Sequence, residues 1–190
     1  TVGEDVTHNA RIVSSIPKRI GIKDRKVIVD GEMICTYKDF EQFKDKYKNP
    51  RNFASGSIRL LDSKECSKRH LTFIAWDCIS GVEAETLSEK LDKLAKLGFY
   101  IVPHGTSDPI SCDGDYQFAI DNIKKRSELL GYPIDGVVFK VDNCTDYAAA
   151  GETSHHPSAA IAYKFYEETY STILRDIEWS MGRTGVLSPI

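Results

Sequence analysis

The chain has 190 residues and a formal net charge of −3, with 41% hydrophobic and 28% charged residues. This composition is ordinary for a globular protein with a proper core, and it excludes a polybasic nucleic-acid binder. Any contact with DNA would therefore come from local clusters of cations. The sequence contains no apolar run long enough to span a membrane and no signal peptide. We therefore expect no membrane partner.

The cysteines indicate a reducing compartment. There are five of them, an odd number, and no two form a C-x-x-C pair. This distribution favours free thiols over a disulfide scaffold or a zinc cluster. The five positions are Cys35, Cys66, Cys78, Cys112 and Cys144.

The hydrophobic pattern predicts an alternation of helices and strands along the whole chain. A short helix is expected near residues 10–13 and is closed by Pro17. Amphipathic spacing predicts a short helix over 37–47 and further helices over 86–97 and 116–130. Alternating or continuous apolar runs predict strands over 26–34, 71–78, 98–103, 134–142, 160–166 and 171–180.

Two of these strands each carry one lysine within an apolar, β-branched run. The pattern is typical of strands buried on most sides, where an ammonium group is costly unless an anion meets it. Lys140 and Lys164 are 24 residues apart, so neighbouring strands would deliver both ammonium groups to one point. Alternatively, each lysine reaches solvent at a strand end. Asp135 and Gly136, which precede the first lysine, favour a phosphate site because Gly136 can take a positive φ near a ligand.

Three further side chains are candidates for contacts with a nucleotide or with phosphate. Arg51 and Arg59 are eight residues apart, a little over two helical turns, so in one helix they would share a face. Two guanidinium groups on one face suit bidentate phosphate contacts, although two solvated surface arginines are the simpler interpretation. Trp76, in the predicted strand 71–78, is a candidate surface for stacking a base. A core tryptophan is an equally good interpretation of that stretch.

Taken together, these segments resemble the adenylation (nucleotidyltransferase) domain of NAD-dependent DNA ligases. The resemblance covers essentially the whole chain, and its motifs occur in the family's order. It implies an α+β fold of antiparallel sheets with flanking helices. Residues 1–174 would form the C-terminal part of the adenylation domain, and residues 175–190 would begin an OB-fold domain at its first strand. The matching segments are 3–7 (GEDVT), 31–32 (GE), 49–62, 135–140, 162–165 and 182–185 (GRTG).

The resemblance implies an enzyme that seals nicked double-stranded DNA with NAD and Mg²⁺. A lysine attacks the α-phosphate of NAD, forms lysyl-AMP and releases nicotinamide mononucleotide. AMP then passes to the 5′-phosphate at the nick, and the 3′-hydroxyl displaces AMP. Physically, such chemistry depends on positioned cations that neutralise charge at phosphorus.

The resemblance also assigns residues that bind the nucleotide. Glu32 matches the glutamate that holds the ribose hydroxyls of adenosine. Lys140 and Lys164 match the lysines around the AMP phosphate. Trp76 stands where the family usually has a tyrosine near the adenine. Arg126 matches an arginine upstream of the Asp135 motif after a shift of one residue.

A second set of residues is implied to act in the chemistry itself. Arg51 and Arg59 match arginines that act at the nicked phosphate and the nucleotide. Asp135 matches the acidic residue of its motif and is expected to help place the metal. Lys140 and Lys164 belong to this set as well, because they stabilise charge on the phosphate.

The sequence departs from the family in one decisive motif, the Lys-x-Asp-Gly that contains the nucleophilic lysine. None of its Asp-Gly pairs has a lysine two positions before the aspartate. We therefore expect that this chain does not seal nicks alone and that a missing segment or a partner chain supplies the lysine. Strand pairing could join such a partner to the sheet. A second departure is the run at residues 155–159 (HHPSA), where the family typically has Arg-x-Pro-Arg-Trp.

Two alternatives to an incomplete ligase remain. The chain could be a non-catalytic module that binds a nucleotide or DNA and has lost the chemistry. It could also be an ATP-dependent relative, which segments 3–7 and 51–62 make the weaker interpretation. Neither end of the chain, Thr1 or Ile190, looks like a natural terminus, so a fragment, a processed chain or one piece of a split protein is expected. The resemblance places it in a bacterial cytosol, or as a viral protein in an infected cell.

Overall fold

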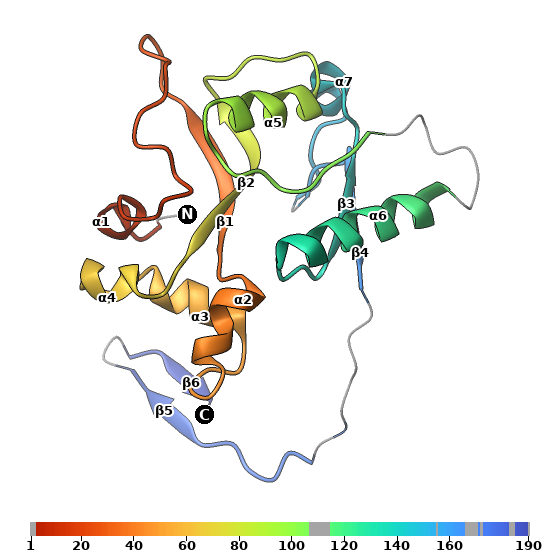
Figure 1. Ribbon diagram of the computed structural model, residues 1–190. Helices are drawn as coiled ribbons and strands as arrows, with labels where there is room; N and C mark the ends of the chain where they lie inside the picture. The colour runs from red at the N-terminus through yellow and green to blue at the C-terminus, as the bar shows by residue number, and fades with distance from the viewer. Residues whose placement is uncertain are drawn as a thin grey trace.

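A computed structural model describes residues 3–106, 115–154, 156–165, 171, 173–182 and 185–189. A long antiparallel ribbon of two strands, β1 and β2, runs through the centre, with helices at both of its ends (Figure 1). A second ribbon, β3 and β4, lies beside it together with α6 and α7 (Figure 1). Within the described ranges, no helix is long and apolar enough to cross a membrane.

The elements confirm a mixed α+β fold in which each pair of strands is antiparallel. The helices are α1 (Thr7–Ala10), α2 (Tyr37–Phe40), α3 (Pro50–Ser57), α4 (Ser63–Ser67), α5 (Leu87–Lys96), α6 (Asp115–Leu130) and α7 (Cys144–Ala149), with a 3-10 turn, η1, at Glu41–Phe43. The strands are β1 (Ile28–Ile34), β2 (Thr72–Ser80), β3 (Gly136–Lys140), β4 (Ala160–Lys164), β5 (Trp179–Met181) and β6 (Leu187–Pro189).

Two hydrophobic clusters occupy the two ends of the central ribbon, and Phe73 packs against both. The first contains α3 residues such as Phe53, and the second contains Leu91 and Leu94 of α5. Both helices begin where the chain supplies a cap. The Asn49 side chain accepts hydrogen bonds from the Arg51 and Asn52 amides, and the Thr86 hydroxyl accepts one from Glu89. These caps fix where α3 and α5 start relative to the ribbon.

The prediction of a strand over 98–103 is wrong except at Ile101. Ile101 forms a single parallel bridge with Ala75 of β2. The Ala75 amide donates to the Tyr100 carbonyl, and the Val102 amide donates back to Ala75. The apolar residues of this segment instead pack into the second cluster, which accounts for the hydrophobic pattern without a ladder.

The strands β3 and β4 are much less buried than predicted. They form a two-stranded sheet, and along β4 only Ala160 is partly covered. The exposed side chains include Val138, Ile161 and Tyr163. An apolar, β-branched run therefore does not by itself distinguish an inner strand from one in a two-stranded sheet.

Gly136 lies inside β3, where another backbone segment approaches so closely that there is no room for a side chain. It is not among the described glycines with positive φ, so the predicted turn conformation is wrong. A Cβ placed on Gly136 would lie 2.2 Å from the Tyr163 carbonyl oxygen and 2.9 Å from the Lys164 Cα. The glycine thus permits the pairing that carries Lys164.

We predict that Gly136→Ala destabilises the protein by about 1–3 kcal/mol, since the added methyl group must displace backbone. Gly56→Ala is the matched control. Gly56 is helical, and a Cβ there meets nothing within 4 Å. This control should stabilise the helix by about 0.5–1 kcal/mol. Urea denaturation measures both changes, and equal unfolding free energies for the two variants would contradict the packing of β3 against β4.

The C-terminal segment contains a short hairpin. Trp179 of β5 pairs with Pro189 of β6, and Met181 pairs with Leu187. The strand predicted over 171–180 therefore begins only at Trp179, and residues 173–178 form neither helix nor strand. The predicted loop 107–114, with Cys112 and Asp113, and His155 lie outside the described residues.

Three buried thiols, those of Cys35, Cys66 and Cys78, give the fold a pH dependence in the alkaline range. Burial and the nearby Asp39 carboxylate raise the pKa of the Cys35 thiol from 9.0 to about 11. Burial also raises the pKa of Cys66 and of Cys78. Between pH 9 and 11 the unfolded chain releases the Cys35 proton while the folded chain retains it, so stability falls as the pH rises.

We predict that the Cys35 contribution lowers the unfolding free energy by up to about 1.4 kcal/mol per pH unit across this range. Urea denaturation at pH 8, 9, 10 and 11 measures the slope. Cys35→Ala should give a shallower slope than the parent. The same slope in both proteins would mean that Cys35 is not shielded as described.

Candidate nucleotide-binding site

One arginine joins two carboxylates from distant parts of the chain. The Arg51 Nε atom lies 3.3 Å from Glu32 Oε1, and Arg51 Nη1 donates to Asp135 Oδ2. Arg51 lies in the first turn of α3, Glu32 lies in β1, and Asp135 immediately precedes β3. The structure therefore brings together three of the residues predicted from the sequence. Each is more than half exposed, with side-chain values of 61%, 53% and 55%, so a ligand can reach them.

The ion pairs of this first cluster, formed by Arg51, Glu32 and Asp135, can be exchanged for contacts with a ligand. Exposed ion pairs contribute only about 0–1 kcal/mol each, because water competes for both partners. A ligand that offers hydroxyls to Glu32 or a cation to Asp135 can therefore replace Arg51 at little cost. The released guanidinium would then be free to meet a phosphate.

A second cluster surrounds Lys140 at the far end of β3. The Lys140 Nζ atom lies 5.2 Å from the centre of the Trp76 ring and 4.0 Å from Asp77 Oδ2. Trp76 is 43% exposed, so the interpretation as a core tryptophan does not hold. An ammonium group over an indole face is a favourable cation–π arrangement. The sequence analysis missed Asp77, although a carboxylate beside a tryptophan within a strand was a signal for it.

The register of the central ribbon links the two clusters. Glu32 lies opposite Ile74, and Trp76 is two residues further along β2. The ladder shifts register between Asp30 and Gly31, whose partners are Asp77 and Ala75, so Trp76 lies at this irregularity, two residues beyond the partner of Glu32. The contact of Lys140 with Asp77 and the contacts of Arg51 with Glu32 and Asp135 connect the two ribbons, one at each cluster.

Lys164 and Lys140 share a face of the second sheet and lie at its two ends. Lys164 lies opposite Gly136, and Lys140 lies opposite Ala160. The two lysines are therefore four residues apart along the sheet, or about 13 Å. The end with Lys164 adjoins the first cluster, because the Phe165 amide donates to the Asp135 carbonyl at 2.9 Å. Each lysine thus accompanies one cluster, and the convergence of both ammonium groups on one phosphate stays a prediction.

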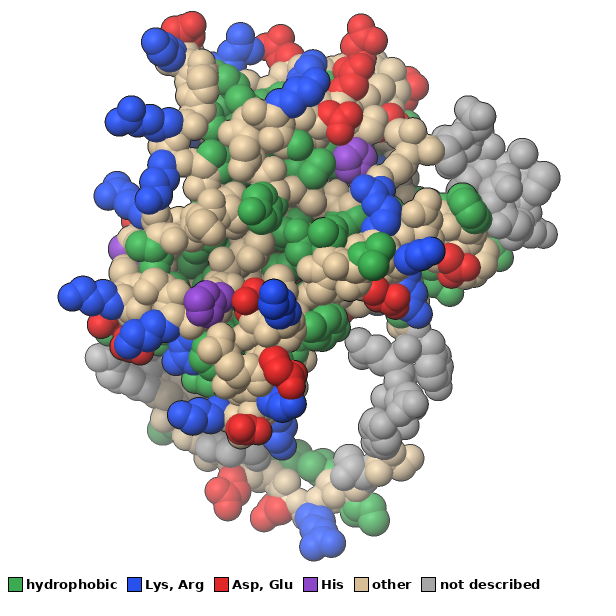
Figure 2. Space-filling view, viewed as in Figure 1, with side chains coloured by type: hydrophobic (Ala, Val, Ile, Leu, Met, Phe, Trp, Pro, Cys, Tyr) green, Lys and Arg blue, Asp and Glu red, His purple; other side chains and the backbone are tan. Residues whose placement is uncertain are grey.

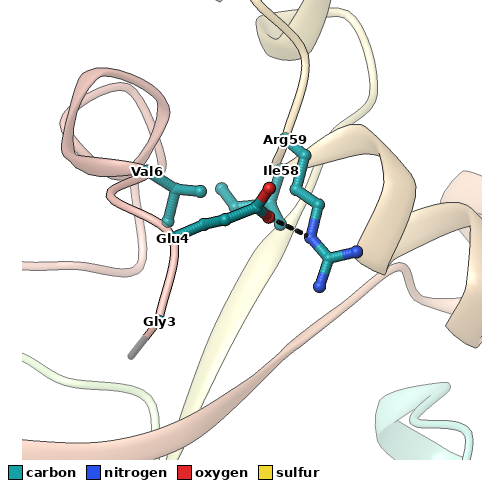
Figure 3. Close-up of a pocket in the computed structure, with 5 residues that line it drawn as sticks. All are labelled: Gly3, Glu4, Val6, Ile58 and Arg59. Atoms are coloured by element: carbon teal, nitrogen blue, oxygen red, sulfur yellow. Dashed lines mark ion pairs between the residues drawn. The ribbon is translucent and has the colours of Figure 1, made fainter. Parts of the chain in front are cut away.

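Arg59 does not share a helical face with Arg51, because α3 ends at Ser57. Its Nε atom instead lies 2.8 Å from Glu4 Oε2, at a hollow lined by Gly3, Glu4, Val6, Ile58 and Arg59 (Figure 3). The two terminal nitrogens of its guanidinium point away from the Glu4 carboxylate (Figure 3). Arg59 therefore presents two donors separately from the first cluster.

Arg126 lies in α6, where its Nη1 atom donates to the His104 carbonyl. The His104 ring is itself 3.6 Å from an Asp92 carboxylate oxygen. These contacts anchor α6 and do not bring Arg126 to either cluster. Lys124 is the α6 cation nearer the site, with its Nζ atom 5.6 Å from the centre of the Phe165 ring, and the sequence analysis missed it.

The donor set suits Mg²⁺ held jointly with a phosphate and does not suit a protein-only metal cage. The described ranges contain no group of three or more His, Cys, Asp or Glu side chains that could hold a metal. Mg²⁺ typically takes one or two carboxylates and completes its shell with water and substrate phosphates. Asp135, half exposed and paired only through an exchangeable contact, fits such a role.

These features define an α+β domain whose lysines, arginine, carboxylates and exposed indole together suit a phosphorylated nucleotide. The sequence profile of the NAD-dependent DNA ligase adenylation domain matches residues 1–168. The chain therefore belongs to the family of NAD-dependent DNA ligase adenylation domains.

Several bacterial proteins named DNA ligase are similar to the chain over its whole length. That of Brachyspira hyodysenteriae is 37% identical over 199 residues, which are 100% of the chain and 29% of the relative. That of Latilactobacillus sakei is 36% identical, and the alignment covers 100% of the chain and 29% of the relative. That of Wolbachia pipientis wMel is 38% identical over 191 residues, with 100% and 28% coverage. The chain thus spans less than a third of the length of these relatives.

Proposed function

We propose that this chain holds the adenylate and the nicked DNA within an NAD-dependent DNA ligase. The observation that carries the proposal is the pair of clusters between the two ribbons, one that contains Glu32 and one that contains Trp76 and Lys140. A carboxylate, an aromatic face and an ammonium group are what the ribose, base and phosphate of a nucleotide require. The membership of the chain in the adenylation-domain family supports the same conclusion.

In this proposal, each residue performs one physical task. The two oxygens of the Glu32 carboxylate accept the ribose hydroxyls, and Trp76 stacks against adenine. Lys140 and Lys164 neutralise charge that builds on the phosphate. NAD supplies the adenylyl group. The two lysines approach the phosphate from opposite ends of the second sheet, since they lie about 13 Å apart along it.

Asp135 and Arg51 complete the site by exchanging partners. Asp135 would hold Mg²⁺ together with phosphate oxygens and water. Arg51 then leaves both carboxylates and turns to a phosphate of the nucleotide or of the nick. In the absence of ligands Arg51 offsets part of the charge of the two carboxylates, and it becomes a bidentate donor for phosphate only when ligands arrive.

The nucleophilic lysine would come from outside these 190 residues, in a further segment or on a partner chain. This follows from the absence of Lys-x-Asp-Gly in the sequence. Residues 1–174 would form the C-terminal part of a nucleotidyltransferase domain, and residues 175–190, with the β5–β6 hairpin, would begin an OB-fold. The assembly would act in the cytoplasm of a bacterium or of a cell infected by a virus.

A local cluster of cations supports contact with DNA despite the negative net charge. The loop 18–26 reads KRIGIKDRK, with five cations against one anion, and all six charged residues are exposed. Lys and Arg side chains gather along the same side of the molecule in the space-filling view (Figure 2). Such a stripe suits the phosphate backbone of DNA, which is read without regard to sequence.

The test is a joining assay on a nicked duplex. The chain is assembled with the Lys-x-Asp-Gly segment, fused or as a partner, and supplied with Mg²⁺ and either NAD or ATP. NAD-dependent joining is expected. Joining with ATP alone would identify an ATP-dependent relative. AMP binding without any joining would instead favour the non-catalytic module, which the missing motif leaves as the second candidate.

A further inference from the structure

A buried asparagine, Asn9, forms hydrogen bonds with the backbone of the segment that contains Arg59. Asn9, at 0% exposure, donates its Nδ2 hydrogens to the Ile58 carbonyl at 2.8 Å and to the Leu60 carbonyl at 2.6 Å. These carbonyls belong to the residues directly before and after Arg59. The Asn9 side chain therefore clamps the backbone on both sides of the arginine.

The hydrogen bonds donated by Asn9 lie just beyond the end of the α3 helix. The α3 helix finishes at Ser57, and the carbonyls just beyond a helix end lack intrahelical donors. Asn9 supplies two donors from a segment 49 residues earlier in the chain. The His8 ring lies 3.0 Å from the same Leu60 carbonyl, and the Ser63 hydroxyl donates to the His8 carbonyl. The start of the chain and the end of α3 are thus tied at several points.

The same N-terminal segment also orients the Arg59 side chain. Glu4 accepts a hydrogen bond from Arg59 Nε at 2.8 Å, and the two terminal nitrogens are turned away from it (Figure 3). Asn9 therefore holds the backbone on both sides of Arg59, and Glu4, five positions before Asn9, holds its exposed side chain. A guanidinium so fixed loses little conformational freedom when it binds a planar anion.

Within the described residues, the Asn9 amide uses its donors and leaves its acceptor unpaired. Its Oδ1 atom is buried without a hydrogen-bond partner in the described structure. A buried amide that leaves an acceptor unsatisfied is unfavourable for folding. The two hydrogen bonds that Asn9 donates to the backbone around Arg59 hold the amide in this orientation.

We propose that Asn9 is a positioning residue that sets Arg59 for contact with a phosphate of the nicked DNA. The proposal rests on the proposed ligase function, and it assigns to Asn9 a role that acts only through Arg59. Asn9 itself touches neither the Arg51 cluster nor Lys140 in the described contacts. The loss of Asn9 should therefore slow the joining of DNA and leave the earlier transfer of AMP to the lysine intact.

A double-mutant cycle in the complete assembly tests this. Asn9→Ser, which is shorter and can donate only one bond, should slow joining by about 10- to 100-fold, the effect of misplacing a catalytic contact. In an Arg59→Ala background the same change should have no further effect, because coupled residues are not additive. The rate of AMP-adduct formation, followed by intact mass, should stay within about twofold of the parent.

The matched control is Ser127→Ala in α6. Ser127 is also almost fully buried, and its hydroxyl also lacks a partner in the described structure, so its removal probes a buried polar group that is remote from Arg59. It should leave joining unchanged. Asn9→Leu preserves the buried volume without any donor and replaces the serine variant if circular dichroism shows that the latter is unfolded.

The outcomes are distinguishable. Equal losses from Asn9→Ser in the parent and in the Arg59→Ala background would overturn the positioning role, as would an equal loss of AMP-adduct formation. If the parent assembly itself neither forms the adduct nor joins DNA, the ligase function fails instead. Non-additive loss confined to joining supports the proposal.

Discussion

Lys140→Ala should reduce NAD-dependent joining by at least about 100-fold in the complete assembly, the scale of losing one preorganised charge at a transition state. Lys140 is the cation placed over Trp76 and beside Asp77, and no other described ammonium shares that position. Its side chain is only 26% exposed, so solvent screens it weakly. The rate of joining at saturating NAD measures the effect.

Lys164→Ala should cause a loss of similar size, because it removes the cation at the other end of the same sheet face. Lys68→Ala is the matched control. Lys68 follows α4 and pairs with Glu65 at 2.6 Å, away from both ribbons. It should join DNA at the parental rate. Parental activity in either site variant would break the assignment of that lysine.

Glu32→Gln should raise the KM for NAD by about 10- to 100-fold, the equivalent of one charge-assisted hydrogen bond of about 1.5–3 kcal/mol. The amide retains the shape of the carboxylate but offers one acceptor where two ribose hydroxyls must be held. It also loses the charge that attracts Arg51, whose Nε atom lies 3.3 Å away. The rate of AMP-adduct formation, measured over a range of NAD concentrations, separates KM from the maximal rate.

Glu65→Gln is the control for this change. Glu65 is similarly exposed, at 52% against 53% for Glu32, and it also pairs with a cation. Its substitution should leave the KM for NAD unchanged. If Glu32→Gln and Glu65→Gln give the same KM as the parent, Glu32 does not bind the ribose.

The sequence predicted those parts of the fold where local patterns carry enough information. Thr86 and its leucine stripe predicted α5, and alternation predicted β1 and β2, each within a few residues of the observed bounds. Resemblance to a known family predicted the antiparallel pairing, which strand patterns alone leave open. Glu32, Arg51 and Asp135 were named from motifs, and the structure brings them into one cluster.

The errors arose where a position depends on distant packing. Helical spacing placed Arg51 and Arg59 on one face. The α3 helix ends at Ser57, however, and beyond it the Asn9 side chain donates a hydrogen bond to a backbone carbonyl. The burial of β3 and β4 was overestimated because a sheet of two strands cannot enclose its residues. The short helix α7 was missed, although the Asn143 side chain caps it by accepting from Thr145 and Asp146. Such caps are recognisable once the segment is considered as a helix.

The most direct test of the central claim is the intact mass of every polypeptide in the natively expressed assembly, before and after addition of NAD and Mg²⁺. An AMP adduct should form on a companion chain, or on a part of a longer chain outside these 190 residues. Peptide mapping then locates the modified lysine. An adduct on a lysine within residues 1–190 would contradict the account, because Lys140 and Lys164 are assigned to the phosphate and not to nucleophilic attack.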